Sequence, residues 1–240
     1  AHDYSGQGND GTLTNMDATD WVKDTGLPGN QFSLDFDGTD DYIDVGNSGN
    51  WNFGTTSAFT FSLWVQFDAN IGTNGILLSS YDGTDGWQWY KSTSTLISIY
   101  PSATLTIPAE DELVVDQWYH FTMTRPASNT APTFYLDGIS LGQFTSTLDA
   151  NNDGNILAIG SNAPGTPPIT HEGSIDDVRI YNRALTANEI ERLAGSGTYS
   201  LGAALDIDGD LTIHSAALDA SSSGYTLNLA GNLANYGGFN

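Results

Sequence analysis

Short apolar runs with a period of two, separated by turn signals, recur along most of this chain. In AFTFSLWVQF (58–67), Trp64 lies on one face and the other face holds Phe59, Phe61, Leu63, Val65 and Phe67. Such alternation is typical of a strand with one buried face. The chain contains about ten runs of this kind at close spacing, a number typical of β-sandwiches and jelly rolls. The sequence therefore predicts an all-β fold, an antiparallel two-sheet jelly-roll sandwich.

The remaining runs complete the expected sandwich, and a single short helix follows it. The other predicted strands are FSLDF (32–36), YIDV (42–45), ILLSSY (76–81), GWQWYK (86–91), LISIY (96–100), WYHFTMT (118–124), ILAIG (156–160) and the strand in EGSIDDVRIY (172–181). A hairpin is predicted in TFYLDGISLGQF (133–144), where Asp137-Gly138 is a two-residue turn signal. The helix is predicted in TANEIERLA (186–194), because Thr186 and Glu189 can form a capping box. Ile190 and Leu193 give this helix one apolar face.

The pattern of the sequence changes after Gly195-Ser196-Gly197. LDIDGDL (205–211) and LNLAGNL (227–233) match as L-x-[IL]-x-G-[DN]-L at a spacing of 22 residues. This internal repeat is of the β-solenoid type, and two coils are fewer than the three or so that normally stand alone. We therefore expect a sandwich over residues 1–197 and a β-repeat appendage over 198–240. The appendage either packs against the sandwich or continues in a longer parent protein.

Composition excludes several function classes. The 240 residues include 29 acidic and 6 basic side chains, a net charge of −23, so neither nucleic acid nor an anionic membrane is an expected partner. There is no Cys, hence no disulfide or thiol chemistry, and no apolar run has the length of a membrane helix. The chain starts at Ala1 and has few Lys. We interpret it as a mature product or an excerpt of an extracellular or cell-surface protein.

Six sequence words in order resemble the laminin-G-like family of the concanavalin A-like superfamily. They are DYSGQGNDG (3–11), LDFDGTDDYIDV (34–45), FTFSLWV (59–65), WYHF (118–121), YLDG (135–138) and GSIDDVRIYNRALTANEI (173–190). The resemblance implies a jelly roll that is closed by the C-terminal helix. It also implies a preceding strand that is absent here. We expect the edge left open to be filled by the tail folding back, or by a strand from another copy.

The same resemblance implies a structural Ca²⁺ that joins the N-terminal loop to the last strand. Carried over, its ligands are Asp3, an oxygen of Asn9, and Asp176, with Asp177 beside them. Asp176 shares strand parity with the core-facing Val178, so it needs a cation or strong hydrogen bonds. The alternatives are an Asx-turn at Asp3 and a surface ion pair between Asp177 and an arginine. The acidic stretch DFDGTDD (35–41) lacks the terminal Glu of a calcium loop and is interpreted as a turn.

Catalytic patterns are missing from the sequence. Glycosidases on this superfold use Glu-x-Asp-x-x-Glu on one strand, and no Glu here builds that pattern. The four His (2, 120, 171 and 214) lack metal-ligand spacing, and no Ser lies in a G-x-S-x-G turn. His120 is interpreted as a satisfied strand residue. We therefore expect a protein that is not an enzyme.

The aromatic cluster around residue 88 is the predicted ligand site. Trp87 and Trp89 share one strand face and can stack on sugar rings, with Tyr90 beside them; the alternative is that this face is core. The nearby polar candidates are Tyr81, Asp82 and Asp85. The predicted function is a calcium-stabilised recognition or adhesion module that binds a glycan or another surface protein. The alternative is a structural subunit of an extracellular fibre or array, which self-associates through its tail or the open sheet edge.

Overall fold

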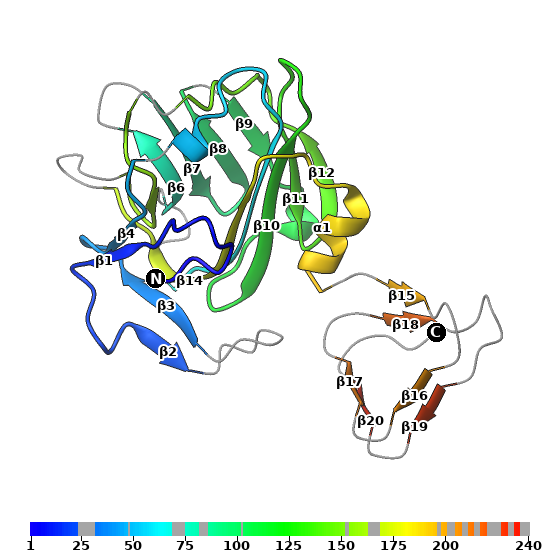
Figure 1. The fold of residues 1–240 in the computed structure, drawn as a ribbon. Coiled ribbons are helices and arrows are strands. Elements are labelled where there is room, and N and C mark those ends of the chain that lie inside the picture. Colours follow the sequence, from blue (N-terminus) through cyan, green and yellow to red (C-terminus); the bar gives the residue numbers. More distant parts are fainter. Residues whose placement is uncertain are drawn as a thin grey trace.

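The computed structural model of the protein describes most of the first 195 residues and the strands of the tail. The described ranges are 1–23, 32–47, 49–68, 75–81, 86–101, 103–151, 154–162, 169–195, 198–200, 205–207, 211–213, 217–219, 227–229 and 233–235. Within them, two antiparallel sheets of seven strands each form the body of the molecule (Figure 1). The predicted jelly-roll sandwich is confirmed.

The first sheet, called sheet A, has the strand order β1-β4-β13-β6-β7-β8-β9. Its strands are β1 (Thr12–Thr14), β4 (Tyr42–Asp44), β13 (Ala158–Ile159), β6 (Gly75–Tyr81), β7 (Gly86–Thr93), β8 (Leu96–Tyr100) and β9 (Ala103–Thr106). Two short 3-10 helices, η1 (Gly49–Trp51) and η2 (Ala109–Asp111), lie in the connections. The long middle strands β6, β7 and β8 pair in sequence order.

The second sheet, called sheet B, has the order β12-β11-β10-β5-β14-β3-β2. Its strands are β12 (Ile139–Gln143), β11 (Thr133–Leu136), β10 (Trp118–Arg125), β5 (Phe59–Gln66), β14 (Glu172–Tyr181), β3 (Phe32–Asp37) and β2 (Trp21–Lys23). Strand β5 lies at the centre of this sheet, between β10 and β14. The hairpin β11–β12 turns at Asp137 and Gly138, which both have positive φ, as the Asp-Gly signal predicted.

The core lies between the two sheets and follows the predicted alternation. Phe59, Phe61, Leu63 and Val65 of β5 have no exposed surface, whereas Trp64 between them is only partly buried. Side chains of β7 and β10 meet this row from the other sheet and from the neighbouring strand. Burial of so many aromatic side chains is the main stabilising term of the sandwich.

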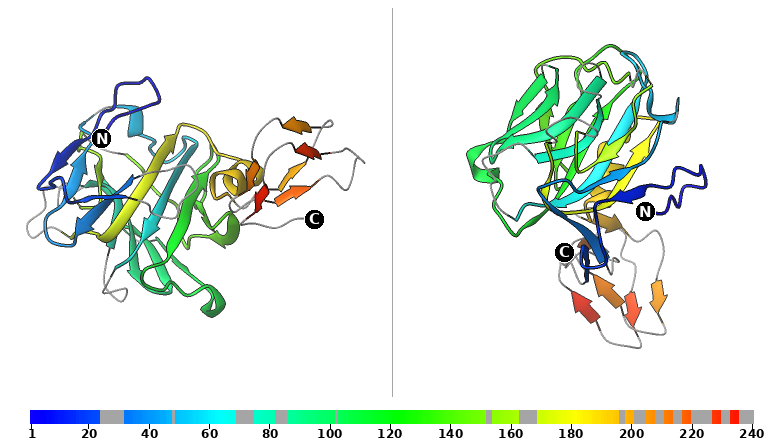
Figure 2. Two further views of the ribbon diagram at one scale, coloured as in Figure 1. Left: turned by 90° about the horizontal axis from the view of Figure 1, so that it is seen from below. Right: turned by 90° about the vertical axis from the view of Figure 1, so that its left-hand side faces the viewer.

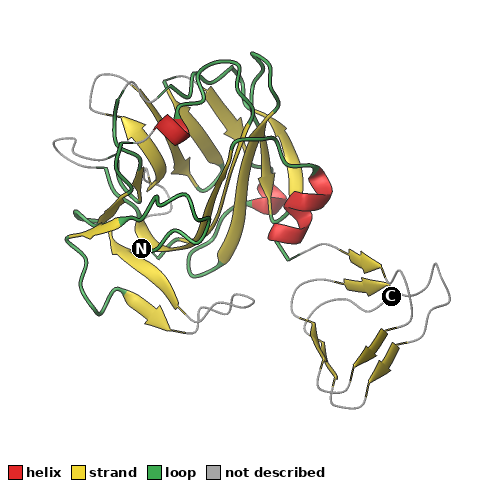
Figure 3. Cartoon of the chain, in the orientation of Figure 1, coloured by secondary structure: helices red, strands yellow, loops and turns green. Residues whose placement is uncertain are grey.

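One α-helix, α1 (Ala187–Leu193), follows the last strand of the sandwich (Figure 3). Its N-terminus has the predicted capping box: the Glu189 amide donates to the Thr186 hydroxyl at 3.3 Å, and the Thr186 amide donates to the Glu189 carboxylate at 2.8 Å. Ile190 is completely buried and Leu193 is partly buried. The helix therefore packs through the apolar face that the sequence predicted.

The strands of the tail pair in parallel with one another. They are β15 (Thr198–Ser200) with β18 (Ala217–Asp219), β16 (Leu205–Ile207) with β19 (Leu227–Leu229), and β17 (Leu211–Ile213) with β20 (Leu233–Asn235). The registers Leu205–Leu227 and Leu211–Leu233 reproduce the repeat spacing. The solenoid itself and a domain boundary at residue 197 stay predictions.

The described tail strands do not join the sandwich. They form three two-stranded sheets of their own, and the left view of Figure 2 shows them beyond α1. The expectation that the tail folds back onto an open sandwich edge is therefore wrong for the part of the chain that is described. The physical reason is that each short tail strand finds its hydrogen-bond partner in the matching repeat.

Candidate functional site

Trp87 and Trp89 are core residues. Both have no exposed surface. Trp87 stacks on Phe61 with ring centroids 5.0 Å apart, and Trp89 lies 6.4 Å from Phe121. A buried indole cannot stack on a sugar ring, so the prediction that these two form a ligand platform is wrong. The alternative that was left open, a core face, is the one observed.

Gln88, between the two tryptophans, and Tyr90, which follows them, point to the opposite side of sheet A. Gln88 lies directly across from Ser79 on β6 and from Tyr100 on β8, and Tyr90 lies across from Ser98. Because side chains alternate along a strand, these residues face away from sheet B. The tyrosine rings are partly exposed, whereas Gln88 and Ser98 are nearly buried. Polar groups therefore lie at the base of this face, with aromatic rings standing above them.

We call this surface the tyrosine face and define it by Tyr81, Gln88, Tyr90, Ser98 and Tyr100. The rings of Tyr81 and Tyr100 lie 4.9 Å apart, although they come from strands on either side of β7. Gly86 on β7 is directly opposite Tyr81 and has no side chain to separate the two rings. The predicted candidates Tyr81 and Tyr90 belong to this face, while Asp82 and Asp85 lie outside the described residues.

Two serine hydroxyl groups lie at the buried base of the tyrosine face. Ser98 Oγ is 2.6 Å from Ser92 Oγ. Ser79 Oγ is buried and has no hydrogen-bond partner among the described residues. A buried hydroxyl without a partner is costly, and such groups are commonly satisfied by water or by a ligand. The partly exposed tyrosines, which carry both a ring and a hydroxyl, are therefore the groups of this face that can stack on a ligand and hydrogen-bond to it.

The N-terminal loop is organised around Asp3. Its carboxylate accepts hydrogen bonds from the Ser5 amide and hydroxyl, both at 2.8 Å, and from the Asn9 amide at 2.9 Å. These hydrogen bonds lower the pKa of Asp3 to about 2, and the bond from the Ser5 hydroxyl has the largest effect. The Asn9 side-chain oxygen accepts from Asn50 at 3.0 Å. This is the Asx-turn arrangement that was the alternative to a metal site.

A β-bulge changes the direction of Asp176. The pairing of β14 with β5 shifts between Asp176 and Arg179, and Asp177 in the bulge has a φ of 48°. Asp176 consequently lies opposite Trp64, on the side of sheet B that faces away from the core, while Val178 packs against the core. The shared parity predicted for Asp176 and Val178 is wrong. The predicted ion pair is present: Asp177 is 2.7 Å from Arg179.

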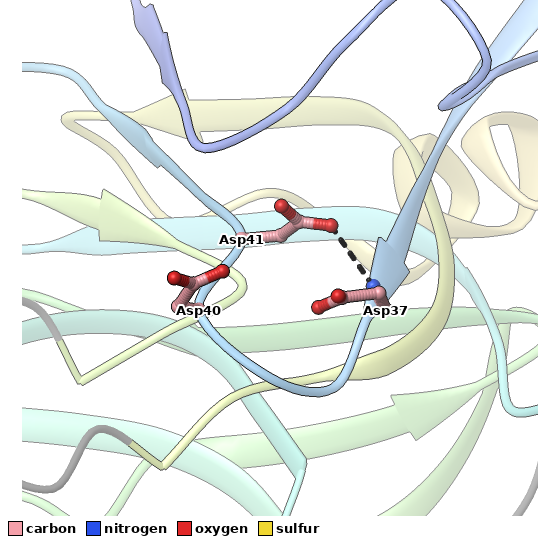
Figure 4. Close-up of side chains that lie close together, drawn as sticks. All are labelled: Asp37, Asp40 and Asp41. Carbon is pink, nitrogen blue, oxygen red and sulfur yellow. Dashed lines mark hydrogen bonds between the residues drawn. The ribbon is translucent and has the colours of Figure 1, made fainter.

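The carboxylates among the predicted calcium ligands do not form a three-carboxylate group in the described chain. Asp3, Asp176 and Asp177 are not among the described side chains that form a group of three or more possible metal ligands. One such group is present in the described chain, Asp37, Asp40 and Asp41, whose oxygens lie within 4.8 Å of one another (Figure 4). The ligand set that the resemblance implies, with an oxygen of Asn9 between Asp3 and Asp176, stays a prediction. A requirement for calcium stays a prediction.

This aspartate group is also a well-formed turn. The Asp41 carboxylate accepts from the Asp37 amide at 3.0 Å, and the Asp37 carboxylate accepts from the Thr39 amide at 2.7 Å. Asp41 is only 4% exposed, and burial, followed by the charge of nearby aspartates, raises its pKa. The stretch forms the turn that the sequence predicted. The missed feature was that the turn directs three carboxylates together.

Neither of the buried histidines is suited to act as a general base. His120 is 2% exposed, lies 2.9 Å from the Ser62 hydroxyl, and has a pKa lowered to about 3 by burial. His171 is fully buried, lies 3.0 Å from the Gln66 carbonyl, and has a pKa lowered to about 4 by burial. Both rings stay neutral at physiological pH and are almost completely shielded from solvent. His120 is the satisfied strand residue that was expected.

The family of the chain is shown by its sequence and agrees with its architecture. The laminin G model of the concanavalin A-like lectin/glucanases superfamily matches residues 37–191. The chain belongs to this superfamily. No curated protein matches its sequence. Among the described residues, no helix is long and apolar enough to cross a membrane.

Solved structures with the same fold share little sequence with this member of the superfamily. Domain 4 of AbnA, an extracellular arabinanase from Geobacillus stearothermophilus, was solved in complex with arabinotriose. It is 17% identical to this chain with a TM-score of 0.53, and the alignment covers 77% of this chain and 82% of that domain. The binding domain of Paraclostridial Mosquitocidal Protein 1 is 17% identical, with a TM-score of 0.52 and coverage of 80% and 48%. A putative carbohydrate binding protein from Bacteroides ovatus is 15% identical, with a TM-score of 0.50 and coverage of 69% and 51%. The chain thus spans about half the length of the last two.

Proposed function

We propose that this protein is a non-catalytic carbohydrate-binding module and that the glycan lies on the tyrosine face. The observation that carries the proposal is the grouping of Tyr81, Tyr90 and Tyr100 above the nearly buried Gln88 and Ser98. The superfamily match supports it, as does the fold shared with an arabinanase domain that was solved with arabinotriose. Fold alone does not define the ligand, so the proposal rests on the residues of the face.

The chemistry of the face suits a sugar. Tyrosine rings offer flat apolar surfaces for the C–H faces of a sugar ring, and their hydroxyl groups still hydrogen-bond with the sugar. The Gln88 amide has both donors and acceptors, so it can pair with hydroxyls of either orientation. Because Gln88 and Ser98 are already nearly desolvated, they lose little further hydration when a ligand covers them.

A binding role fits better than a hydrolytic one. Strands β6, β7 and β8, which carry the tyrosine face, contain no Asp or Glu. Glycoside hydrolysis ordinarily requires two carboxyl groups that flank the scissile bond. The proposal therefore assigns recognition, and not cleavage, to this face.

The location and the cation belong to the same proposal. An acidic chain without Cys, with few Lys and a fold shared with a domain of an extracellular enzyme, is consistent with a secreted or surface-attached protein. We also propose that Ca²⁺ stabilises the module, with its site at the Asp37 group or, as the resemblance implied, at Asp3. Hard carboxylate oxygens in loops are the ligands that Ca²⁺ prefers.

The test is binding of neutral oligosaccharides, starting with arabinotriose and a panel of other neutral glycans, measured by calorimetry. Tyr90→Ala and Tyr100→Ala should abolish binding without a change in melting temperature. Tyr135→Ala is the matched control, because Tyr135 is an equally half-buried tyrosine on the outer side of sheet B. Equal binding by all three variants would exclude the tyrosine face, and hydrolysis of a bound glycan would exclude the non-catalytic role.

A second candidate function, a subunit of an extracellular fibre or array, rests on the tail. Its strands pair in parallel at the repeat spacing, a geometry that can be continued by a further matching strand. Sedimentation of the full chain tests it. Assembly that disappears when residues 198–240 are removed would favour this candidate.

A further inference from the structure

The edge strand β2 and its neighbour β3 present an aromatic and cationic surface. Their register places Trp21 opposite Leu34 and Lys23 opposite Phe32, so these four side chains share one face. Trp21 is 44% exposed and Phe32 is 46% exposed, and Lys23 is exposed as well. We call Trp21, Lys23 and Phe32 the β2 patch. It is separate from the tyrosine face, which belongs to the other sheet.

The side chains of the β2 patch are close neighbours. The Asp35 amide donates to the Asp20 carbonyl at 2.8 Å, so Asp20 and Asp35 form a hydrogen-bonded pair of the antiparallel ladder. This pair lies next to the Trp21–Leu34 pair. In an antiparallel ladder the two kinds of pair alternate, so Trp21–Leu34 and Lys23–Phe32 are the non-hydrogen-bonded pairs, whose side chains approach more closely. Trp21 and Phe32 therefore occupy diagonal positions on one face, and Lys23 occupies the position directly across from Phe32.

Lys23 is unusual among the basic residues of the chain. There are six of these, and Lys91 and Arg125 are buried. Arg179 and Arg183 are paired with Asp177 and Glu189, each at 2.7 Å. Lys23 and Arg192 have no ion pair among the described residues. Within the described part of the chain, which has most of the 29 acidic side chains, no carboxylate is thus paired with the cation of the β2 patch.

The acidic side chains of this ribbon are directed to its other face. Asp20 and Asp35 alternate with Trp21 and Leu34 along β2 and β3, so they lie on the side opposite the β2 patch. The ribbon consequently has one acidic face and one face with two aromatic rings and a positive charge. An anionic ligand is complementary to the second face only.

The edge of β2 is poorly suited to pairing with another strand. It is three residues long, and a lysine on a short edge strand is a common device against strand addition. A ligand that uses the side chains, and not the backbone of the edge, is the better match. Two neighbouring aromatic rings favour a ring-shaped ligand with an apolar face.

We propose that the β2 patch binds an acidic saccharide. The apolar face of a sugar ring packs on Trp21 and Phe32, and its carboxylate or sulfate group pairs with the Lys23 ammonium. This inference goes beyond the proposed binding of neutral glycans at the tyrosine face and does not depend on it. Together the two surfaces would let one module hold a chain of mixed charge at two places.

The experiment compares three soluble probes by calorimetry at about 0.15 M salt, where the repulsion from the remote acidic residues is largely screened. The probes are trigalacturonate, a sulfated disaccharide and the neutral galactotriose. We expect the full chain to bind one or both acidic probes. Lys23→Gln and Trp21→Ala should each weaken that binding about tenfold or more, and Lys23→Arg should restore it.

Two control variants make the test specific. Arg192→Gln removes the other unpaired cation, which lies in α1 away from the β2 patch, and should leave acidic binding unchanged. Tyr90→Ala should also leave it unchanged, so a failure of the tyrosine face is seen separately, in the neutral probes alone. Melting temperatures equal to that of the parent chain establish that each variant is folded.

Three results would overturn the inference. The first is a full chain that binds no acidic probe at millimolar concentration. The second is a Lys23→Gln variant that binds the acidic probes as tightly as the parent chain does, or a Tyr90→Ala variant that no longer binds the acidic probes. The third is a dimer in sedimentation that Trp21→Ala abolishes, because the patch would then be a contact between two copies of the chain.

Discussion

Trp87 stacks on Phe61 across the interior of the sandwich, with ring centroids 5.0 Å apart and an angle of 13° between the ring planes. The pair joins β7 of sheet A to β5 of sheet B, and neither side chain has exposed surface. The contact therefore holds the two sheets together at their centre. It also directs Gln88, the next residue along β7, to the opposite side of sheet A, so core packing and the tyrosine face depend on the same strand.

We predict that Trp87→Ala lowers the free energy of unfolding by about 3–5 kcal/mol, because it removes a large buried ring and leaves a cavity. Denaturant unfolding measures this change. Tyr90→Ala is the matched control, since Tyr90 lies three residues further along β7 and is partly exposed. It should change the stability far less. Equal losses in the two variants would contradict the assignment of Trp87 to the core.

Arg125 is a second buried element on which stability depends. It has no exposed surface, and its guanidinium donates to the carbonyls of Ser57, Gly54 and Leu148, with Nη2 2.7 Å from the oxygen of Ser57. Arg125→Met should leave several buried carbonyls without donors and lower the free energy of unfolding by about 3 kcal/mol. Arg125→Lys should recover only part of the loss, because an ammonium cannot reach all three carbonyls. Arg192→Met, at an exposed position, is the control.

The sandwich was predictable because its signals are local. The alternation in β5, the Asp-Gly turn at 137–138 and the capping box at Thr186 each specify a backbone conformation within a few residues, and all three are observed. The face of β7 was harder to assign. Trp87 and Trp89 share one side in any strand, and whether that side meets solvent or Phe61 depends on the other sheet.

The candidate sites depended on longer-range geometry and were predicted only in part. Tyr81 and Tyr90 were identified, but Tyr100 was not, because its proximity to Tyr81 arises from the pairing of three strands. The direction of Asp176 was wrong because one bulge residue, Asp177, reverses the alternation in β14. A non-glycine residue with positive φ in a strand leaves no distinct signature in a sequence.

The carboxyl groups make the stability depend on pH in two opposite directions. Burial raises the pKa of Asp35 and Asp68, so the folded state binds protons more tightly there, and the stability that they contribute is lost as the pH rises through their raised values. Hydrogen bonds, chiefly from Ser5 and Arg183 respectively, lower the pKa of Asp3 and Glu189 to about 2, so their contribution is lost as the pH falls from about 4 towards 2.

Burial lowers the pKa of His120 and His171 to about 3 and 4, so the unfolded state binds more protons at these rings as the pH falls below about 6.5, and we expect the melting temperature to decrease from pH 7 downwards. The falling negative charge of the whole chain acts in the same direction as Asp35 and Asp68 in the upper range. Asp68→Asn removes part of this opposing contribution, so it should make the decrease steeper above pH 4 and leave the decrease at lower pH unchanged. A slope unaffected by this substitution would assign the opposing contribution to net charge alone.

Removal of the tail should leave the sandwich intact. The described tail strands pair only with one another, and α1, which precedes them, closes the sandwich through the buried Ile190. A chain of residues 1–197 should therefore melt at nearly the same temperature as the full chain. A truncation at 185, which also removes α1, is the comparison and should be clearly less stable. A large loss on removing residues 198–240 alone would show that the tail supports the sandwich.

Calcium should stabilise the protein, and two variants separate the possible sites. A ligand that binds only the folded state adds about 2.7 kcal/mol of stability at a hundredfold excess over its dissociation constant, so millimolar Ca²⁺ should raise the melting temperature. The oxygens of Asp37, Asp40 and Asp41 already lie within 4.8 Å of one another, whereas the Asp3 carboxylate accepts hydrogen bonds from Ser5 and Asn9.

Asp40→Asn should therefore abolish the calcium-dependent rise in melting temperature, and Asp3→Asn should lower the melting temperature equally with and without calcium. The reverse result would place the ion at the N-terminal loop. If chelation leaves the melting temperature unchanged in protein shown beforehand to hold the metal, calcium has no stabilising role at either place.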